Sequence, residues 1–207
     1  MTTLTNARLY LRARMGLHST DQLAQDTELT YALNEGLHAY SSELDWWWLE
    51  DQTSFTTTAG TATYALPADH KITKQLWIGD ELLAPRQYQD LIRLSEDSSA
   101  TPAYYAIKDS LIYLSPKPAN STTTVYHYYV RQETALSSGS DTPLIPTRYD
   151  GLWLSHAAVI MADRMDNPQK RMIHERARDE WLKRARDEAR AHRGLVPVKA
   201  RRDTSWG

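Results

Sequence analysis

Apolar residues recur at helical spacing near both ends of the chain and at strand spacing between them. At the N-terminus, residues three and four positions apart predict a helix over residues 6–15: Leu4, Ala7, Leu11 and Met15. Gly16 follows, and glycine commonly ends a helix because it adopts the left-handed conformation without strain. The chain therefore opens with a helix whose apolar side must pack against another element.

A second helix is predicted from Thr27, its expected N-cap, to the tryptophan run that begins at Trp46. Its apolar stripe keeps the three- and four-residue spacing through Leu29, Leu33, Leu37, Tyr40, Leu44 and Trp47. Asn34 and Gly36 stand in its middle, although neither is a good helix former. Either a strongly periodic helix tolerates both residues, or each marks a close contact or a functional position.

From Trp48 to Tyr129 the pattern changes to short runs of β-branched and aromatic residues separated by turn signals. Residues 87–94 interrupt these runs as a short helix or turn-rich segment. Prolines stand at the ends of the runs, which is where a residue without a backbone N–H is tolerated. About seven short strands at this spacing predict an antiparallel sandwich or a small barrel.

Two further helices are predicted after the loop at residues 136–143. The first, over residues 147–166, is apolar nearly all round and should be buried on most sides. The second, over residues 169–192, is densely charged and has a narrow apolar stripe: Ile173, Ala177, Trp181, Ala185 and Ala189. The segment beyond Gly194 has no helical period and cannot build a core alone.

The fold class predicted from these patterns is α+β. The N- and C-terminal segments should form a four-helix bundle, with an antiparallel β-sandwich or small barrel inserted and an extended C-terminal tail. The expected boundaries place the N-terminal helices at 1–47, the β lobe at 48–135, the loop and closing helices at 136–193, and the tail at 194–207.

Composition narrows the classes of protein to consider. The chain has 207 residues, enough for one domain carrying an inserted lobe, and it has no cysteine. Disulfides, catalytic thiols and cysteine-ligated zinc are therefore excluded. No stretch approaches the roughly 20 apolar residues that span a bilayer, and the first residues lack the pattern of a signal peptide. We therefore expect a soluble protein without membrane contact, made in a cytoplasm.

Charge is distributed unevenly along the chain. Residues 1–163 carry 11 basic and 19 acidic residues, a net charge of −8, whereas residues 164–207 carry 13 and 7, a net charge of +6. This asymmetry has two interpretations: two faces that meet different partners, or a solvated basic helix that ends the chain.

Catalytic and cofactor signatures are missing from the sequence. Gly139-Ser140 lies in a serine-rich loop without the strand-to-helix context of a nucleophile elbow. The seven histidines show no metal-ligand spacing, and the glycines form no phosphate-binding or dinucleotide fingerprint. We expect no metal, no cofactor and no enzymatic activity, although a pair of catalytic carboxylates, for example Glu50 and Asp51, would leave no detectable spacing.

Nucleic-acid binding by the basic C-terminal region is a further hypothesis. Its arginines and lysines could follow a phosphate backbone. However, acidic residues interleave with them at three- and four-residue distances, which is typical of an exposed helix face that pairs with itself: Glu175, Asp179, Glu180, Asp187 and Glu188. Specific recognition of a duplex is therefore disfavoured.

The order of several short elements carries a resemblance to a known family. These elements are Leu33-Asn34-Glu35-Gly36, the Trp46–Trp48 run, Tyr64-Ala65-Leu66-Pro67-Ala68-Asp69, Pro102 to Ile107, Leu114 to Pro118, Tyr128-Tyr129, and Ile145-Pro146 followed by Tyr149. Each is weak alone, but in this order, from about Leu4 to Arg190, the chain resembles the head-to-tail adaptor proteins of tailed bacteriophages.

The resemblance implies a structural protein of the virion neck. Such proteins form a ring, usually of twelve copies, below the portal protein, where the ring extends the DNA channel with transient, non-specific DNA contact. The ring receives a downstream neck or tail protein, such as a stopper, tail tube or nozzle. The family carries no catalytic residues.

Two sets of residues are candidates for contacts in this setting. The portal-binding candidates lie in the C-terminal tail: Leu195, Val198, Lys199, Arg201, Arg202 and Trp206. The candidates for an acidic surface facing the channel or neck lie in loops of the β lobe: Asp80, Glu81, Glu96 and Asp97. Carboxylates along a channel would let DNA slide, and a basic tail would face acidic protein.

Two rival functions remain open from the sequence. One is a carbohydrate- or partner-binding β module of a tail or attachment protein, for which the tryptophan run could be a sugar-stacking platform. The other is a hydrolase with unrecognised catalytic carboxylates.

Overall fold

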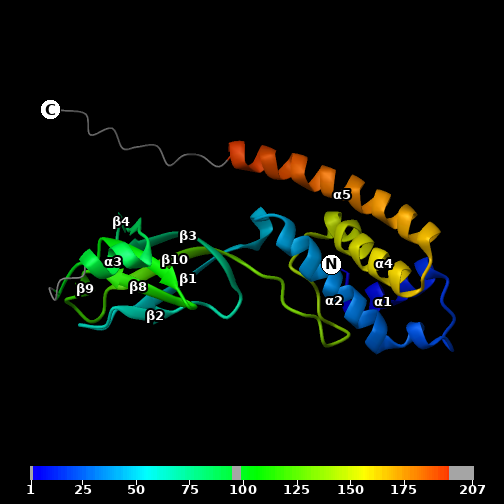
Figure 1. Ribbon diagram of the computed structural model, residues 1–207, viewed down its shortest axis with the longest axis horizontal. Helices are drawn as coiled ribbons and strands as arrows, with labels where there is room; N and C mark the ends of the chain where they lie inside the picture. The colour runs from blue at the N-terminus through cyan, green and yellow to red at the C-terminus, as the bar shows by residue number, and fades with distance from the viewer. Residues whose placement is uncertain (1, 95–98, 196–207) are drawn as a thin grey trace. The chain divides into compact units, whose positions relative to one another are not determined.

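The computed structural model describes residues 2–94 and 99–195 and divides them into two compact units. The described residues up to Trp48 and from Glu133 onward form a helical unit, and Leu49–Gln132 form a β unit (Figure 1). The tail beyond Leu195 and the loop at residues 95–98 lie outside the described residues.

Four α-helices build the helical unit, and α4 lies at its centre. They are α1 (Leu4–Met15), α2 (Asp26–Glu43), α4 (Asp150–Arg164) and α5 (Pro168–Leu195), with 3₁₀ turns at Gln22–Ala24, Trp47–Leu49 and Thr147–Tyr149. Helix α4 packs against α1, α2 and α5. It buries side chains on most of its circumference, which confirms the prediction for this segment: Leu152, Trp153, Leu154, Ala157, Ala158, Met161 and Ala162.

The predicted four-helix bundle is wrong. Helix α5 packs mainly against α4, whereas each helix of a closed bundle packs against two neighbours. The predicted stripe of α5 was partly right, because Ala185 and Ala189 are buried, whereas Ile173 is 60% exposed. His174 and Leu182, which the stripe did not include, also face inward. The helix moreover continues to Leu195, one residue past the predicted start of the tail.

Two residues that are poor helix formers, Asn34 and Gly36, fix helix α2 against its neighbours. A Cβ atom added at Gly36 would lie 2.8 Å from the backbone nitrogen of Ala157 and 2.9 Å from the carbonyl oxygen of Trp153. Gly36 therefore lets α2 approach the backbone of α4 more closely than any side chain would allow. The amide of Asn34 bonds the backbone of Leu136 in the loop before α4. Both residues mark close contacts.

The predicted helix ends were partly right. Gly16 ends α1 in the left-handed conformation, with φ 62°, and its N–H bonds back to the carbonyl oxygens of Arg12 and Ala13. Helix α2, however, begins at Asp26 with Gln25 as its N-cap, so Thr27 lies inside the helix.

Three sheets form the β unit. The first, which we call sheet A, has the order β1-β10-β3-β4, formed by Glu50–Thr56, Thr124–Arg131, His70–Ile78 and Glu81–Leu82. The second, sheet B, has the order β2-β8-β7-β5, formed by Thr63–Ala65, Leu111–Ser115, Tyr104–Lys108 and Ala84–Pro85. The two-residue strands β6 (Ser99–Ala100) and β9 (Lys117–Pro118) pair separately.

The predicted antiparallel insertion also needs correction. Strands β5 and β7 pair in parallel, and so do β6 and β9. The short helix α3 (Tyr88–Leu94) lies where the sequence predicted a short helix or turn-rich segment, and with it the described chain has five α-helices. Of the predicted fold class, the α+β composition holds.

Sheets A and B share one hydrophobic core. Its buried members come from both sheets and the segment between them: Leu76, Ile78, Leu83, Tyr105, Ile112, Leu114 and Val125. The rings of Phe55 and Tyr64 stack beside this core with centroids 4.6 Å apart. Each fully buried large side chain contributes about 1.5–3 kcal/mol, so this cluster is sufficient to hold the two sheets together.

Candidate functional site

The tryptophan run forms a buried aromatic stack in the helical unit. Trp46 is fully buried, and its indole N–H donates to the carbonyl oxygen of Tyr40 at 2.8 Å. Its ring stacks on Trp48 with centroids 4.7 Å apart, and Trp48 stacks on Tyr149 at 5.1 Å. The ring faces of Trp46 and Trp48 are therefore occupied by protein, which leaves them unsuited to be a sugar-stacking platform.

Arg148 covers the outer side of this stack. Its guanidinium lies 5.7 Å from the ring centroid of Trp47 and 5.1 Å from that of Tyr149. The same side chain pairs with Glu188 of α5. Cation–π contacts of this kind contribute roughly 0.5–1 kcal/mol each at exposed sites. Arg148 thus joins the aromatic stack to α5.

The carboxylate of Glu133 fixes the chain where it re-enters the helical unit. It accepts the hydroxyl of Tyr40 and the backbone N–H groups of Leu144 and Ile145, at 3.0 and 3.1 Å. Burial and the adjacent Glu133 raise the pKa of Tyr40 far above its ordinary value. Tyr40 therefore stays protonated and serves as a hydrogen-bond donor in this clamp, with no role as an acid or base.

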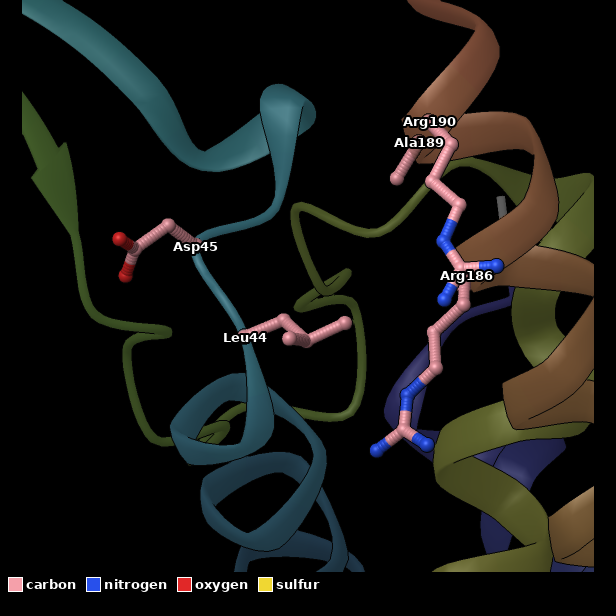
Figure 2. A pocket seen from close by; sticks show the side chains of 5 residues that line it. All are labelled: Leu44, Asp45, Arg186, Ala189 and Arg190. Atoms are coloured by element: carbon pink, nitrogen blue, oxygen red, sulfur yellow. The ribbon is translucent and has the colours of Figure 1, made fainter. Parts of the chain in front are cut away.

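A pocket of about 360 Å³ lies between the C-terminal end of α2 and α5. Figure 2 shows its lining, with the side chain of Leu44 pointing toward α5 and the guanidinium groups of Arg186 and Arg190 on the facing side. Arg186 pairs with Glu43 at 2.9 Å, while Arg190 is largely exposed and its nearest carboxylate, that of Asp187, is 3.8 Å away. The pocket offers apolar surface beside two arginine side chains, a combination that suits a protein partner.

Several charges of α5 are paired within the chain. Arg171 bonds Asp163 and Glu175, Arg178 bonds Asp179, and the pairs of Arg186 and Arg190 add to these. Such surface pairs contribute little stability, about 0–1 kcal/mol each, but they reduce the positive potential of the helix. This agrees with the sequence argument against specific duplex recognition by α5.

Only some of the residues predicted to make contacts lie in the described part of the chain. Asp80 is exposed in the turn between β3 and β4, and Glu81, which is also exposed, is the first residue of β4. Glu96 and Asp97 lie outside the described residues, as do Val198, Lys199, Arg201, Arg202 and Trp206 of the tail. Leu195 is the last residue of α5.

A polar network in the β unit escaped the sequence analysis. The hydroxyl of Thr73 lies 2.9 Å from the Nε2 atoms of both His70 and His127, and the hydroxyl of Tyr129 donates to Asp69 at 3.0 Å. His127 is fully buried, and burial together with the neighbouring His70 lowers its pKa to about 4. Burial likewise lowers the pKa of His70. Both rings are therefore neutral near pH 7, and the network is structural.

Metal binding finds no support within the described residues, where no group of three histidine or acidic side chains is placed to hold an ion. Among the same residues, no helix has the length and apolar character to cross a membrane. The features that remain are aromatic, apolar and charged surfaces suited to protein contacts.

Comparison with protein families gives a match to the SU10 adaptor protein over residues 3–203. The chain belongs to this family. The match covers both structural units and agrees with the resemblance carried by the short sequence elements. A search of curated proteins returned no match.

Membership of the SU10 adaptor family indicates a structural role as an adaptor in a phage particle. It implies association with other head or tail proteins and a place in the virion. The family is one of structural adaptor proteins. We therefore interpret three features as parts of an assembly protein: the paired charges, the buried tryptophans and the arginine-lined pocket.

Proposed function

We propose that this chain is the head-to-tail adaptor of a tailed phage, which forms a ring below the portal protein, extends the DNA channel and docks the next neck or tail protein. The family match over residues 3–203 is the observation that carries this proposal. The adaptor acts by binding and positioning other proteins and performs no catalysis. Twelve copies form the ring.

The helical unit forms the body of the ring in this proposal. Its supporting features are the tight α2–α4 contact at Gly36, the aromatic stack at Trp46 and the clamp at Glu133, which together make a rigid block. Rigid blocks lose little conformational entropy when they associate, which favours a defined ring.

The tail docks onto the portal. It carries three basic residues and Trp206, a residue type that frequently anchors interfaces. Arg186 and Arg190, which line the pocket between α2 and α5, belong to the same basic region of the sequence as the tail. The portal surface that receives the tail should accordingly be acidic, with an apolar recess for the indole.

The channel surface is net negative, with the turn at Asp80 and Glu81 and the loop residues Glu96 and Asp97 as contributors. A negative surface repels the phosphate backbone and lets DNA pass without lasting contact. A structure of the ring whose channel surface was predominantly positive would contradict this part of the proposal.

Mass measurement by light scattering tests the assembly directly. The adaptor is measured alone, with the purified portal of the same phage, and as a variant truncated after Leu195. We expect the full chain to form a ring-sized complex on the portal and the truncated chain to lose portal binding. A matched control in the full chain, Lys183→Ala on the exposed side of α5, should bind normally.

Two outcomes would reject parts of this proposal. A full chain that stays monomeric and does not bind the portal would remove the adaptor function. A truncated chain that binds the portal as well as the full chain would remove only the role of the tail.

A further inference from the structure

Positive charge is concentrated near the end of α5 and in the residues that follow this helix. Residues 164–182 carry 5 basic and 4 acidic residues, a net charge of +1, whereas residues 183–207 carry 8 and 3, a net charge of +5. The first half of α5 is therefore nearly neutral. The second half and the tail together favour an acidic partner.

The pocket between α2 and α5 lies in this basic region. It has a volume of about 360 Å³, and its lining consists of Leu44, Asp45, Arg186, Ala189 and Arg190. In Figure 2 the side chain of Leu44 points toward α5, whereas the carboxylate of Asp45 points away from both guanidinium groups. The pocket therefore combines two cations on the side of α5 with apolar surface from both helices.

Arg186 is held in place by a carboxylate of α2. Its guanidinium lies 2.9 Å from Oε2 of Glu43, and Oε1 of the same carboxylate is 3.8 Å from Nε2 of His156 in α4. Burial and the nearby Arg178 lower the pKa of His156 to about 4, so this ring is neutral near pH 7. The charge of Glu43 is thus balanced by Arg186, and the pair fixes the end of α2 against α5.

Arg190 has its guanidinium available for a partner. Its side chain is 82% exposed, and its nearest carboxylate in the described chain, that of Asp187, is 3.8 Å away. This distance is too long for a hydrogen bond. A guanidinium binds a carboxylate through two parallel hydrogen bonds, which makes the contact both strong and directional. Arg190 is therefore the group of the pocket that is suited to bind an acidic side chain.

The lining of the pocket suits a peptide segment better than a nucleic-acid backbone. The carboxylates of Glu43 and Asp187 flank the two arginines and would repel a continuous row of phosphates. A peptide needs to place only one carboxylate, on Arg190, and its neighbouring side chain can cover the apolar surface of Leu44. The ligand chemistry that fits is an acidic residue close to an apolar one.

We propose that this pocket receives an acidic segment of the portal protein, with an apolar side chain against Leu44 and a carboxylate on Arg190. This inference rests on the proposed adaptor function and names a portal-binding site within the described residues. Leu195, the last residue of α5, lies five residues after Arg190, about 8 Å along the helix, and the tail proposed to bind the portal follows it. Two sites this close on one chain reinforce each other, because binding at one raises the effective concentration at the other.

The test replaces Arg190 with glutamate in the full chain and measures binding to the purified portal of the same phage. We expect at least tenfold weaker binding at physiological salt, with the mass of the ring unchanged. The matched control is Arg176→Glu, which makes the same change of charge at another exposed position of α5. Arg176 lies about 21 Å from Arg190 along the helix, beyond the Debye length of about 8 Å, so this variant should bind normally.

A second variant, Leu44→Ser, tests the apolar side of the pocket and leaves its charges in place. We expect weaker portal binding with the same salt dependence as the wild type. Binding by Arg190→Glu, in contrast, should depend less on salt, because an ion pair is lost. Circular dichroism checks the fold of each variant, and Arg190→Glu alone decides the outcome if Leu44→Ser does not fold.

Four outcomes would overturn the inference while the wild type still binds the portal. The first is normal portal binding by Arg190→Glu or by folded Leu44→Ser, and the second is an equal loss for Arg190→Glu and Arg176→Glu, which would show a general effect of charge. The third is a loss of ring mass by Arg190→Glu with portal binding intact, which would make a neighbouring copy the occupant. The fourth is a loss of binding to duplex DNA or to the following neck protein in place of the portal.

Failure of the adaptor function itself has a different result. In that case the wild-type chain binds neither the portal nor any other purified neck or tail protein, and the inference fails with the function. A wild type that binds the portal, together with variants that behave as in any of the four outcomes, rejects the pocket alone.

Discussion

Asn34 and Leu136 exchange two hydrogen bonds as if they were neighbouring residues of a sheet. The Nδ2 of Asn34 donates to the carbonyl oxygen of Leu136 at 3.0 Å, and the N–H of Leu136 donates to Oδ1 of Asn34 at 2.8 Å. An amide side chain is the one group that supplies a donor and an acceptor in this geometry. The helix interior therefore carries an asparagine because the loop before α4 needs a backbone partner.

Replacing Asn34 with leucine should destabilise the helical unit. The variant leaves the N–H and carbonyl groups of Leu136 without partners in a partly buried site, at a cost of about 1–3 kcal/mol. Urea unfolding followed by circular dichroism measures the free energy of unfolding. Asn6→Leu on the exposed side of α1 is the control, with an expected change within about 0.5 kcal/mol. Equal stability of both variants would show that the pair contributes nothing.

The buried histidine of the β unit should make stability depend on pH. The folded-state pKa of His127 is lowered to about 4, whereas the unfolded value is near 6.5. The unfolded chain therefore binds more protons in this range, so the stabilisation is complete above pH 6.5 and is lost as the pH falls toward 4. One pKa unit corresponds to about 1.4 kcal/mol, so the difference of roughly 2.5 between the two pKa values sets an upper limit of about 3–4 kcal/mol for His127.

Unfolding of the wild type and of His127→Gln from pH 7.5 to pH 4.5 measures this effect. Glutamine can still bond Thr73 but does not titrate, so its stability should fall less steeply with acid. His156 of α4 also has a pKa lowered to about 4 by burial and by Arg178, so part of the slope should persist. Identical slopes for both chains would exclude His127 as a source of the pH dependence.

Two alanine substitutions in α5 test which side of the helix packs inward. Leu182→Ala removes a side chain that is almost fully buried, and such changes typically cost about 2–5 kcal/mol. Ile173→Ala removes an exposed side chain and should change the free energy of unfolding by about 0.5 kcal/mol or less. Thermal or urea unfolding compares the two, and a larger loss for Ile173→Ala would reverse the orientation of α5.

Local signals were enough to predict some elements of the fold. Gly16 ends α1 because glycine needs no compensation in the left-handed conformation, and the apolar run around Trp153 predicted the buried helix α4. These features depend on neighbouring residues in the chain. The order of helices, strands and helices followed from the same kind of signal.

Features that depend on distant residues were not predictable from the sequence. In α5, Ala185 and Ala189 of the predicted stripe are buried, but the inward position of His174 in place of Ile173 depends on where α4 lies. Strands of two residues, such as β5, carry no periodicity, so their parallel pairing left no pattern. The contact of His70 and His127 with Thr73 requires the register of β3 on β10, which is shifted by an irregularity near Tyr129.

The candidate site shows the same division. Tyr126 and Tyr128 alternate with the buried residues of β10 in the sequence, but their exposure of 38% each depends on which elements cover the outer face of sheet A. The pocket lined by Arg186 and Arg190 requires the end of α2 to meet α5, two segments far apart in the sequence. The turn at Asp80 was predicted from the sequence, whereas the contact of Asp80 and Glu81 with the channel or the neck is a proposal.

The clamp at Glu133 sets an order of events during synthesis. Tyr40 leaves the ribosome early, and its partner Glu133 follows only after the whole β unit has been made. The β unit is contiguous in the chain and can complete its sheets first, whereas the helical unit must hold α1 and α2 open until the later helices arrive. Nascent chains that end before α4 should therefore present an unprotected α2 face.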